Sequence, residues 1–110
     1  MANAYGLTES DRAQIVGAFR QFEEIATVVL FGSRAKGNYK LGSDVDLAVK
    51  GDRITQRTIA QLADVLNEDL PLPYYFDVVQ YNTLESQPLV DHIDRVGVVI
   101  YDRAEELTPI

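Results

Sequence analysis

The first part of the chain carries a helical repeat of apolar residues followed by an unbroken apolar run. Apolar side chains recur at helical spacing over residues 15–22, and they follow Thr8, a residue type that favours helix N-termini. This pattern predicts a helix that Thr8 caps and that ends near Glu23. Residues 26–31 are continuously apolar and rich in β-branched side chains, which predicts a strand buried on both faces.

The middle of the chain predicts two more strands and a longer helix. Residues 44–50 alternate between polar and apolar side chains, as in a strand with one face on the core. Apolar residues then recur at helical spacing over residues 54–70, and Pro71 and Pro73 end that helix. Residues 74–80 are rich in β-forming side chains and predict the third strand.

The last third of the chain predicts a short helix, a final strand and an acidic tail. Residues 87–95 carry Pro88 near the first helical position, and Gly97 precedes a β-rich run at residues 98–101. Residues 102–110 are interpreted as the tail. This order of elements favours an α+β fold in which helices pack against one small mixed β-sheet. The pattern leaves the order of the strands open.

Length and composition fit one globular domain. Of the 110 residues, 46% are hydrophobic and 25% are charged. Two separate cores would each be marginal at this size, so residues 1–110 are expected to form a single domain. The absence of cysteine excludes disulfides, thiolate metal sites and a catalytic thiol. Because no signal-like or membrane-spanning run is present, the chain is expected in the cytoplasm, with no membrane partner.

The charge of the chain argues against nucleic acid as a partner. The formal net charge is −7, whereas affinity for a phosphate backbone comes from clustered Lys and Arg. Six of the ten basic residues lie between residues 34 and 57, and only Arg95 and Arg103 follow. An anionic small molecule bound near the first half of the chain is therefore favoured over a long nucleic acid.

A spaced pair of short motifs carries the candidate chemistry. Gly32-Ser33 is followed, after ten residues, by Asp44-Val45-Asp46. Alternation along a strand sends Asp44 and Asp46 to one face and Val45 to the other, toward the core. Divalent cations such as Mg²⁺ bind carboxylate oxygens and share them with substrate phosphates. The acidic pair therefore predicts a metal site beside a phosphate-binding loop.

The loop itself contains suitable donors for phosphate. Ser33 is expected to cap a short helical turn, where the hydroxyl and the unpaired backbone N–H groups can donate to phosphate oxygens. Arg34 and Lys36 would add positive charge at the same phosphates. The loop thus predicts a nucleotide-binding segment.

A third acid, Asp77, lies within the apolar third strand. A buried carboxylate in such a strand is costly unless it is paired or bound to a metal ion. If this strand lies next to the second, Asp77 completes a site of three carboxylates with Asp44 and Asp46. Such a site can hold two metal ions, about 4 Å apart, for in-line displacement at an α-phosphate.

Two other candidate sites are rejected. A P-loop needs Lys followed by Ser or Thr where this chain has Asn38 and Tyr39. The single histidine, His92, has no second His or Cys with which to form a soft-metal site, so it is expected to be a surface residue without a role.

These motifs together resemble the nucleotidyltransferase superfamily of DNA polymerase beta, and more closely its minimal nucleotidyltransferases. The segments that match that group are residues 32–37, 43–47 and 97–101. The resemblance implies that Gly32 and Ser33 hold the triphosphate, that Asp44 and Asp46 bind two Mg²⁺ ions, and that Asp77 is the third catalytic carboxylate. It also implies a nucleoside triphosphate substrate, expected to be ATP.

The resemblance further implies a partner, a helical HEPN-domain protein. Some such pairs are toxin–antitoxin systems in which the transferase adenylylates a hydroxyl of the toxin. Two alternatives stay open at this stage. One is an antitoxin without catalysis that neutralises its partner by occlusion, and the other is a transferase for a small molecule, as with aminoglycosides.

Overall fold

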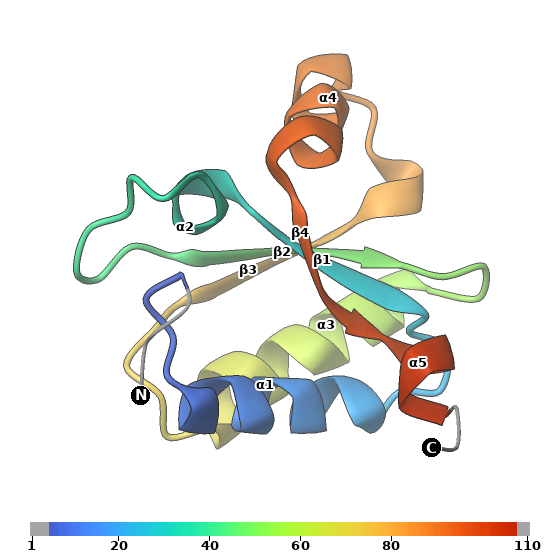
Figure 1. The fold of residues 1–110 in the computed structure, drawn as a ribbon. Helices are drawn as coiled ribbons and strands as arrows, with labels where there is room; N and C mark the ends of the chain where they lie inside the picture. The colour runs from blue at the N-terminus through green and yellow to red at the C-terminus, as the bar shows by residue number, and fades with distance from the viewer. Residues whose placement is uncertain (1–4, 108–110) are drawn as a thin grey trace.

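A single sheet lies between two layers of helices in the computed structural model, which describes residues 5–107, with side chains to residue 105. Helices α1 (Glu9–Arg20) and α3 (Gln56–Asp64) cover one face of the sheet, and the short α2 (Gly32–Lys36) and α4 (Gln87–Val96) lie on the other (Figure 1). No helix within residues 5–107 is long and apolar enough to cross a membrane.

The sheet has four strands in the order β3-β2-β1-β4. The strands are β1 (Thr27–Phe31), β2 (Val45–Lys50), β3 (Phe76–Gln80) and β4 (Val98–Asp102). The central strand β1 runs antiparallel to both β2 and β4, whereas β2 and β3 are parallel. The sheet is therefore mixed, and the expected α+β fold is confirmed. The strand order, which the sequence left open, puts β3 directly beside β2.

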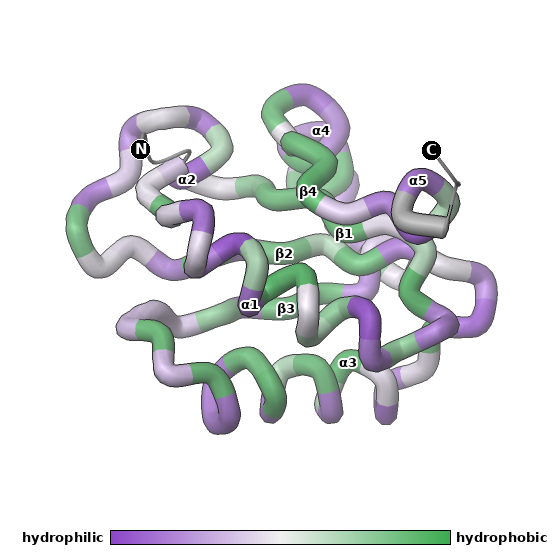
Figure 2. Tube along the Cα trace, turned by 60° about the horizontal axis from the view of Figure 1, so that its bottom comes forward, coloured by the Kyte–Doolittle hydropathy of each residue, from purple (hydrophilic) through white to green (hydrophobic). Residues whose placement is uncertain are grey.

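Apolar side chains fill both sides of the central strands. The larger cluster, on the side of α1 and α3, includes Val28 and Leu30 of β1. The smaller cluster, on the side of α4, joins Val29 to Ile93. Burial on both faces of β1 is thus as expected from its unbroken apolar sequence. Figure 2 shows the same pattern, with hydrophobic colour along the strands and alternating colour along α3.

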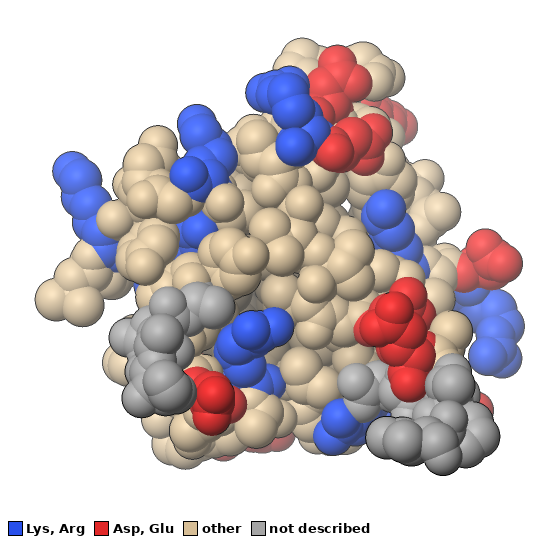
Figure 3. All heavy atoms as spheres, viewed as in Figure 1, with Lys and Arg blue, Asp and Glu red and all other residues tan. Residues whose placement is uncertain are grey.

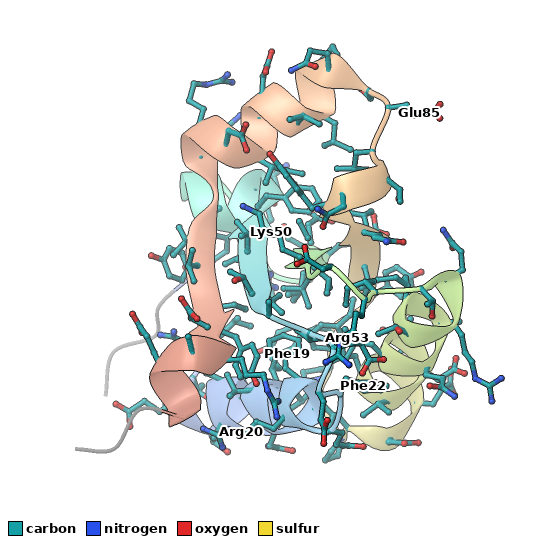
Figure 4. All side chains as sticks on the ribbon, turned by 90° about the vertical axis from the view of Figure 1, so that its right-hand side faces the viewer. Phe19, Arg20, Phe22, Lys50, Arg53 and Glu85 are labelled. Carbon is teal, nitrogen blue, oxygen red and sulfur yellow. The ribbon has the colours of Figure 1, made fainter. Side chains whose placement is uncertain are left out.

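Helix α1 begins as its sequence indicates. The Thr8 hydroxyl accepts a hydrogen bond from the Asp11 N–H (2.9 Å), and the Thr8 N–H donates to the Asp11 carboxylate (3.1 Å). This reciprocal capping box satisfies two donors that a helix start leaves unpaired. The helix ends at Arg20, earlier than the expected Glu23. Phe19 is fully buried and points from α1 toward the sheet (Figure 4). The centroid of its ring lies 5.5 Å from the centroid of the Tyr101 ring.

The second long helix differs from the single helix expected over residues 54–70. Thr55 caps α3, which starts at Gln56, and the last turn widens to a π-helix, η1 (Val65–Asp69). Asn67 in this turn donates to the Phe76 carbonyl (3.0 Å) and accepts from the Phe76 N–H (2.8 Å). The side chain of Asn67 thus pairs with the backbone where β3 begins and fixes the start of that strand beside the helix.

The prediction of an irregular acidic tail over residues 102–110 is wrong for residues 102–107. Asp102 is the last residue of β4, and residues 103–107 form a short helix, α5 (Arg103–Leu107). The Asp102 carboxylate accepts from the Ala104 N–H (3.0 Å), which favours helix initiation at this point. Residues 108–110 lie outside the described residues. A 3₁₀ turn, η2 (Tyr81–Thr83), connects β3 toward α4.

Candidate active site

The acidic pair lies where β2 begins. Val45 and Leu47 are fully buried in the cluster toward α1 and α3, so the intervening Asp46 faces the opposite side of the sheet, the side of α2 and α4. Asp46 is half-buried and aligns with Phe31 of β1. Asp44 is exposed and precedes the strand, which starts at Val45, one residue later than expected. The alternation inferred for the strand itself is confirmed.

Asp77 aligns directly with Asp46 across the parallel pair β2 and β3. The adjacency on which a three-carboxylate site depended is therefore present. Asp77 is exposed, however, because β3 is an edge strand, so the expected burial cost does not apply to it. Among the three acids, Asp46 is half-buried, whereas Asp44 and Asp77 are exposed.

The three carboxylates interact electrostatically. Burial and, to a smaller extent, the negative charges of Asp77 and Asp44 together raise the pKa of Asp46 to about 6, against the opposing effect of Arg34. Within the described residues, no group of three or more acidic or histidine side chains is close enough to hold a metal ion as it stands. The donor set nevertheless fits a hard divalent cation, since the charge of an ion would remove the repulsion that raises the pKa of Asp46.

Gly32 lies directly against Asp46. Its φ is +77°, a conformation that favours glycine, and a Cβ built at this position would collide with Asp46 Oδ2. Only glycine lets the backbone come this close to the carboxylate. The first motif and the acidic pair thus meet in space as well as in sequence.

Ser33 is the second residue of α2 and does not cap it. The cap position belongs to Phe31, which is extended and makes no side-chain cap hydrogen bond. The capping expected of Ser33 is therefore wrong, because β1 turns into the helix two residues earlier through the positive φ of Gly32. Ser33 remains half-buried in the first turn of α2, two residues from the partner of Asp46 in the sheet.

Arg34 and Lys36 have contrasting surroundings. Arg34 is only 2% exposed, and its guanidinium donates to the carbonyls of Ser43 (2.8 and 3.2 Å) and Tyr5 (3.0 Å). It also lies over the Tyr39 ring, 5.3 Å from its centroid. These contacts join the two ends of the loop that leads to Asp44. Lys36, in contrast, is exposed at the end of α2.

A hollow on the described surface is lined in part by residues of this loop. It measures about 450 Å³ and is lined in part by Arg34, Tyr39 and Tyr74. None of the three carboxylates lines it, so it is not the site that they form. We therefore assign the site from the placement of the acids and Gly32, and not from the hollow.

His92 is a residue of this region whose contacts the sequence did not reveal. Its Nε2 accepts a hydrogen bond from the Gly32 N–H at 3.1 Å, and its ring lies edge-on to Phe31, with centroids 6.1 Å apart. The expected surface position is wrong, because His92 is half-buried and hydrogen-bonded to Gly32. The two partners are 60 positions apart in the chain, and a single histidine carries no spacing that would have indicated the contact.

The sequence comparison shows the family of the chain. The family model for polymerase beta nucleotidyltransferases matches residues 13–106. The chain belongs to this nucleotidyltransferase family. No curated protein sequence matches the chain.

Solved structures with the same fold include several toxin–antitoxin complexes. A toxin–antitoxin structure with AMP-PNP superposes with a TM-score of 0.70 at 23% identity, covering 88% of this chain and 79% of that one. The MntA–HepT toxin–antitoxin gives 0.65 at 19% identity, with 90% and 76% covered. A tri-AMPylated Shewanella oneidensis HEPN toxin in complex with its MNT antitoxin gives 0.63 at 21%, with 87% and 75% covered. At these identities, the likeness shows the fold.

Proposed function

We propose that this chain transfers AMP from ATP to a hydroxyl group of a helical HEPN-domain partner, and that it is the antitoxin of a toxin–antitoxin pair in the cytoplasm. In this proposal residues 1–110 form one minimal nucleotidyltransferase domain. The observation that carries it is the meeting of three residues at the same end of neighbouring strands: Gly32 lies against Asp46, and Asp46 is aligned with Asp77.

The triphosphate is proposed to bind at the start of α2. Gly32 lets the backbone come close to the half-buried carboxylate of Asp46, but its N–H is already donated to His92. The backbone N–H and the hydroxyl of Ser33 are the proposed donors there. Lys36 is exposed and free to approach the β- and γ-phosphates. Arg34 was expected to bind phosphate as well, but its donors are bonded to backbone carbonyls. We therefore assign to Arg34 the role of bracing the loop that presents Asp44.

Asp44, Asp46 and Asp77 are proposed to hold two Mg²⁺ ions. When bound, the ions would stabilise the charge that develops at the α-phosphate and favour ionisation of the acceptor hydroxyl. Because the pKa of Asp46 is about 6, this carboxylate is mainly ionised at neutral pH and available as a ligand. The fit rests on oxygen donors alone, which are the ligands that Mg²⁺ prefers.

The acceptor is proposed to enter from the β3 edge. Asp77 is exposed on this edge strand, so a hydroxyl of a second protein can reach its carboxylate. The acceptor oxygen forms a bond to the α-phosphorus, its proton passes to Asp77, and the bond from the α-phosphorus to the bridging oxygen breaks. Pyrophosphate leaves, and the partner carries a phosphodiester to AMP.

The identity of the partner rests on the structural neighbours and on charge. Several neighbours are toxin–antitoxin complexes, and one contains a tri-AMPylated HEPN toxin. Nucleic acid is a poor acceptor for a chain of net charge −7. On the face drawn in Figure 3, the basic side chains are scattered and do not form a continuous patch.

Labelled ATP distinguishes this reaction from its alternatives. The purified chain, Mg²⁺ and the neighbour-encoded helical protein are incubated in parallel with α-labelled and γ-labelled ATP. We expect label on the partner from α-labelled ATP only. Label from γ-labelled ATP would indicate phosphoryl transfer and contradict the proposal. No label in a complex that nevertheless forms would favour neutralisation by occlusion.

A further inference from the structure

His92 connects helix α4 to the turn between β1 and α2. Its Nε2 lies 3.1 Å from the backbone nitrogen of Gly32, and its half-buried ring packs edge-on against Phe31, the last residue of β1. An N–H donor requires an unprotonated acceptor, so His92 is neutral in this arrangement and carries its proton on Nδ1. The imidazole thus acts on the Gly32 peptide as an acceptor.

Gly32 is constrained on two sides. The Asp46 carboxylate occupies the space next to its Cα, and the imidazole of His92 receives its N–H. Its φ of +77° is one of several conformations open to glycine, and these two neighbouring groups select it. The orientation of the Gly32 peptide sets the direction in which the next backbone N–H groups of α2 point.

We propose that His92 is a positioning residue for the triphosphate, acting through the Gly32 peptide and not by contact with the nucleotide. This inference rests on the proposed function and adds a residue from α4 to it. Apart from this hydrogen bond, α4 is joined to the sheet through a small apolar cluster that includes Ile93 and Val29. His92 is therefore a specific polar link between α4 and the motif loop.

Two substitutions separate the hydrogen bond from the shape of the ring. His92→Gln keeps an acceptor at similar reach from the helix, whereas His92→Phe keeps the ring and removes the acceptor. Binding of Mg²⁺·AMP-PNP, measured by calorimetry, should weaken about five- to tenfold in His92→Phe, as expected for one lost hydrogen bond. His92→Gln should bind within about twofold of the wild-type protein.

Each outcome decides the inference. Unchanged binding in His92→Phe, or a His92→Gln variant that binds as weakly as His92→Phe, would overturn it while leaving the proposed function intact. Failure of the wild-type protein to bind Mg²⁺·AMP-PNP would refute the proposed function and this inference together.

A further measurement uses the wild-type protein alone and so does not depend on the folding of a variant. In ¹⁵N-labelled wild-type protein, a scalar coupling across the hydrogen bond should connect the Gly32 nitrogen with Nε2 of His92. Absence of this coupling would contradict the geometry on which the inference depends.

Discussion

Asp46 and Asp77 occupy aligned positions on the neighbouring parallel strands β2 and β3, although 30 residues separate them in the chain. Their carboxylates are near enough for the charge of Asp77 to raise the pKa of Asp46. Such a like-charged pair costs folding free energy when no cation is present. This cost provides a way to test the site without measuring catalysis.

We expect Asp46→Asn to stabilise the protein at pH 8 in EDTA. The folded state raises the pKa of Asp46 from 3.8 to about 6, so ionisation of this group above pH 6 destabilises the fold. The gain should be about 1 kcal/mol, a value reduced for the partial exposure of the group. This gain in stability should decline as the pH falls from 6 toward 4, because the Asp46 carboxyl then becomes protonated in the folded state and, at the lower end, in the unfolded state as well. Chemical unfolding at each pH measures it.

The same variant should lose its response to Mg²⁺. An ion that binds only the folded protein raises the stability of the wild type, and this increase should be much smaller in Asp46→Asn. The exposed Asp64→Asn, on α3 and on the opposite face of the sheet, serves as control. A loss of stability in Asp46→Asn at pH 8 would contradict the electrostatic account.

Gly32→Ala should destabilise the protein more than Gly37→Ala. Both glycines have positive φ, +77° and +88°, but a Cβ at Gly37 meets nothing within 4 Å, whereas one at Gly32 collides with Asp46. The backbone term alone costs about 1 kcal/mol, and the collision should bring the cost at Gly32 to roughly 2–3 kcal/mol. Urea unfolding of both variants gives the comparison, and equal costs would argue against the close approach of Gly32 to Asp46.

Arg34→Lys and Lys36→Ala should affect different properties. Lysine cannot reproduce the forked contacts of Arg34 to the carbonyls of Ser43 and Tyr5, so we expect a loss of about 2 kcal/mol in stability. Lys36 is exposed, and its removal should change stability by less than about 0.5 kcal/mol while weakening Mg²⁺·ATP binding. Unfolding experiments measure the stability of both variants, and calorimetry measures their binding of Mg²⁺·ATP. A stability loss confined to Lys36→Ala and a binding loss confined to Arg34→Lys would contradict the roles assigned to these residues.

Tyr101→Phe should stabilise the fold. The Tyr101 hydroxyl is buried without a hydrogen-bond partner in the described structure, and an unsatisfied buried hydroxyl costs about 1 kcal/mol or more. Tyr74→Phe is the matched control, since the Tyr74 hydroxyl donates to the Asp11 carboxylate at 2.6 Å. We expect that variant to lose about 1 kcal/mol. Thermal unfolding that ranks the two variants in the opposite order would contradict this assignment.

Local features of the chain were predictable because neighbouring residues determine them. The Thr8 cap and the buried β1 follow from side-chain chemistry and from spacing within a few positions. The spacing of Gly32 and Asp46 indicated a joint site for the same reason: a short loop leaves the end of one strand and the start of the next close together.

Features that depend on distant contacts were not predictable. The hydrogen bond of His92 joins elements 60 residues apart, and the burial of Arg34 requires the carbonyl of Tyr5 on one side and that of Ser43 on the other. The exposure of Asp77 follows from the edge position of β3, which only the strand order reveals. The sequence alone did not indicate which groups His92 and Arg34 contact or that Asp77 is exposed.

Intact-mass spectrometry of the partner tests the central claim most directly. The neighbour-encoded helical protein is incubated with Mg²⁺, ATP and, in turn, the wild-type chain, Asp44→Asn, Asp77→Asn or the control Asp64→Asn. We expect the partner to gain one or more AMP groups with the wild type and the control. Either active-site variant should slow this gain about a thousandfold, as loss of several kcal/mol of charge stabilisation requires. A gain that is as fast with Asp44→Asn and Asp77→Asn as with the wild type would contradict the account.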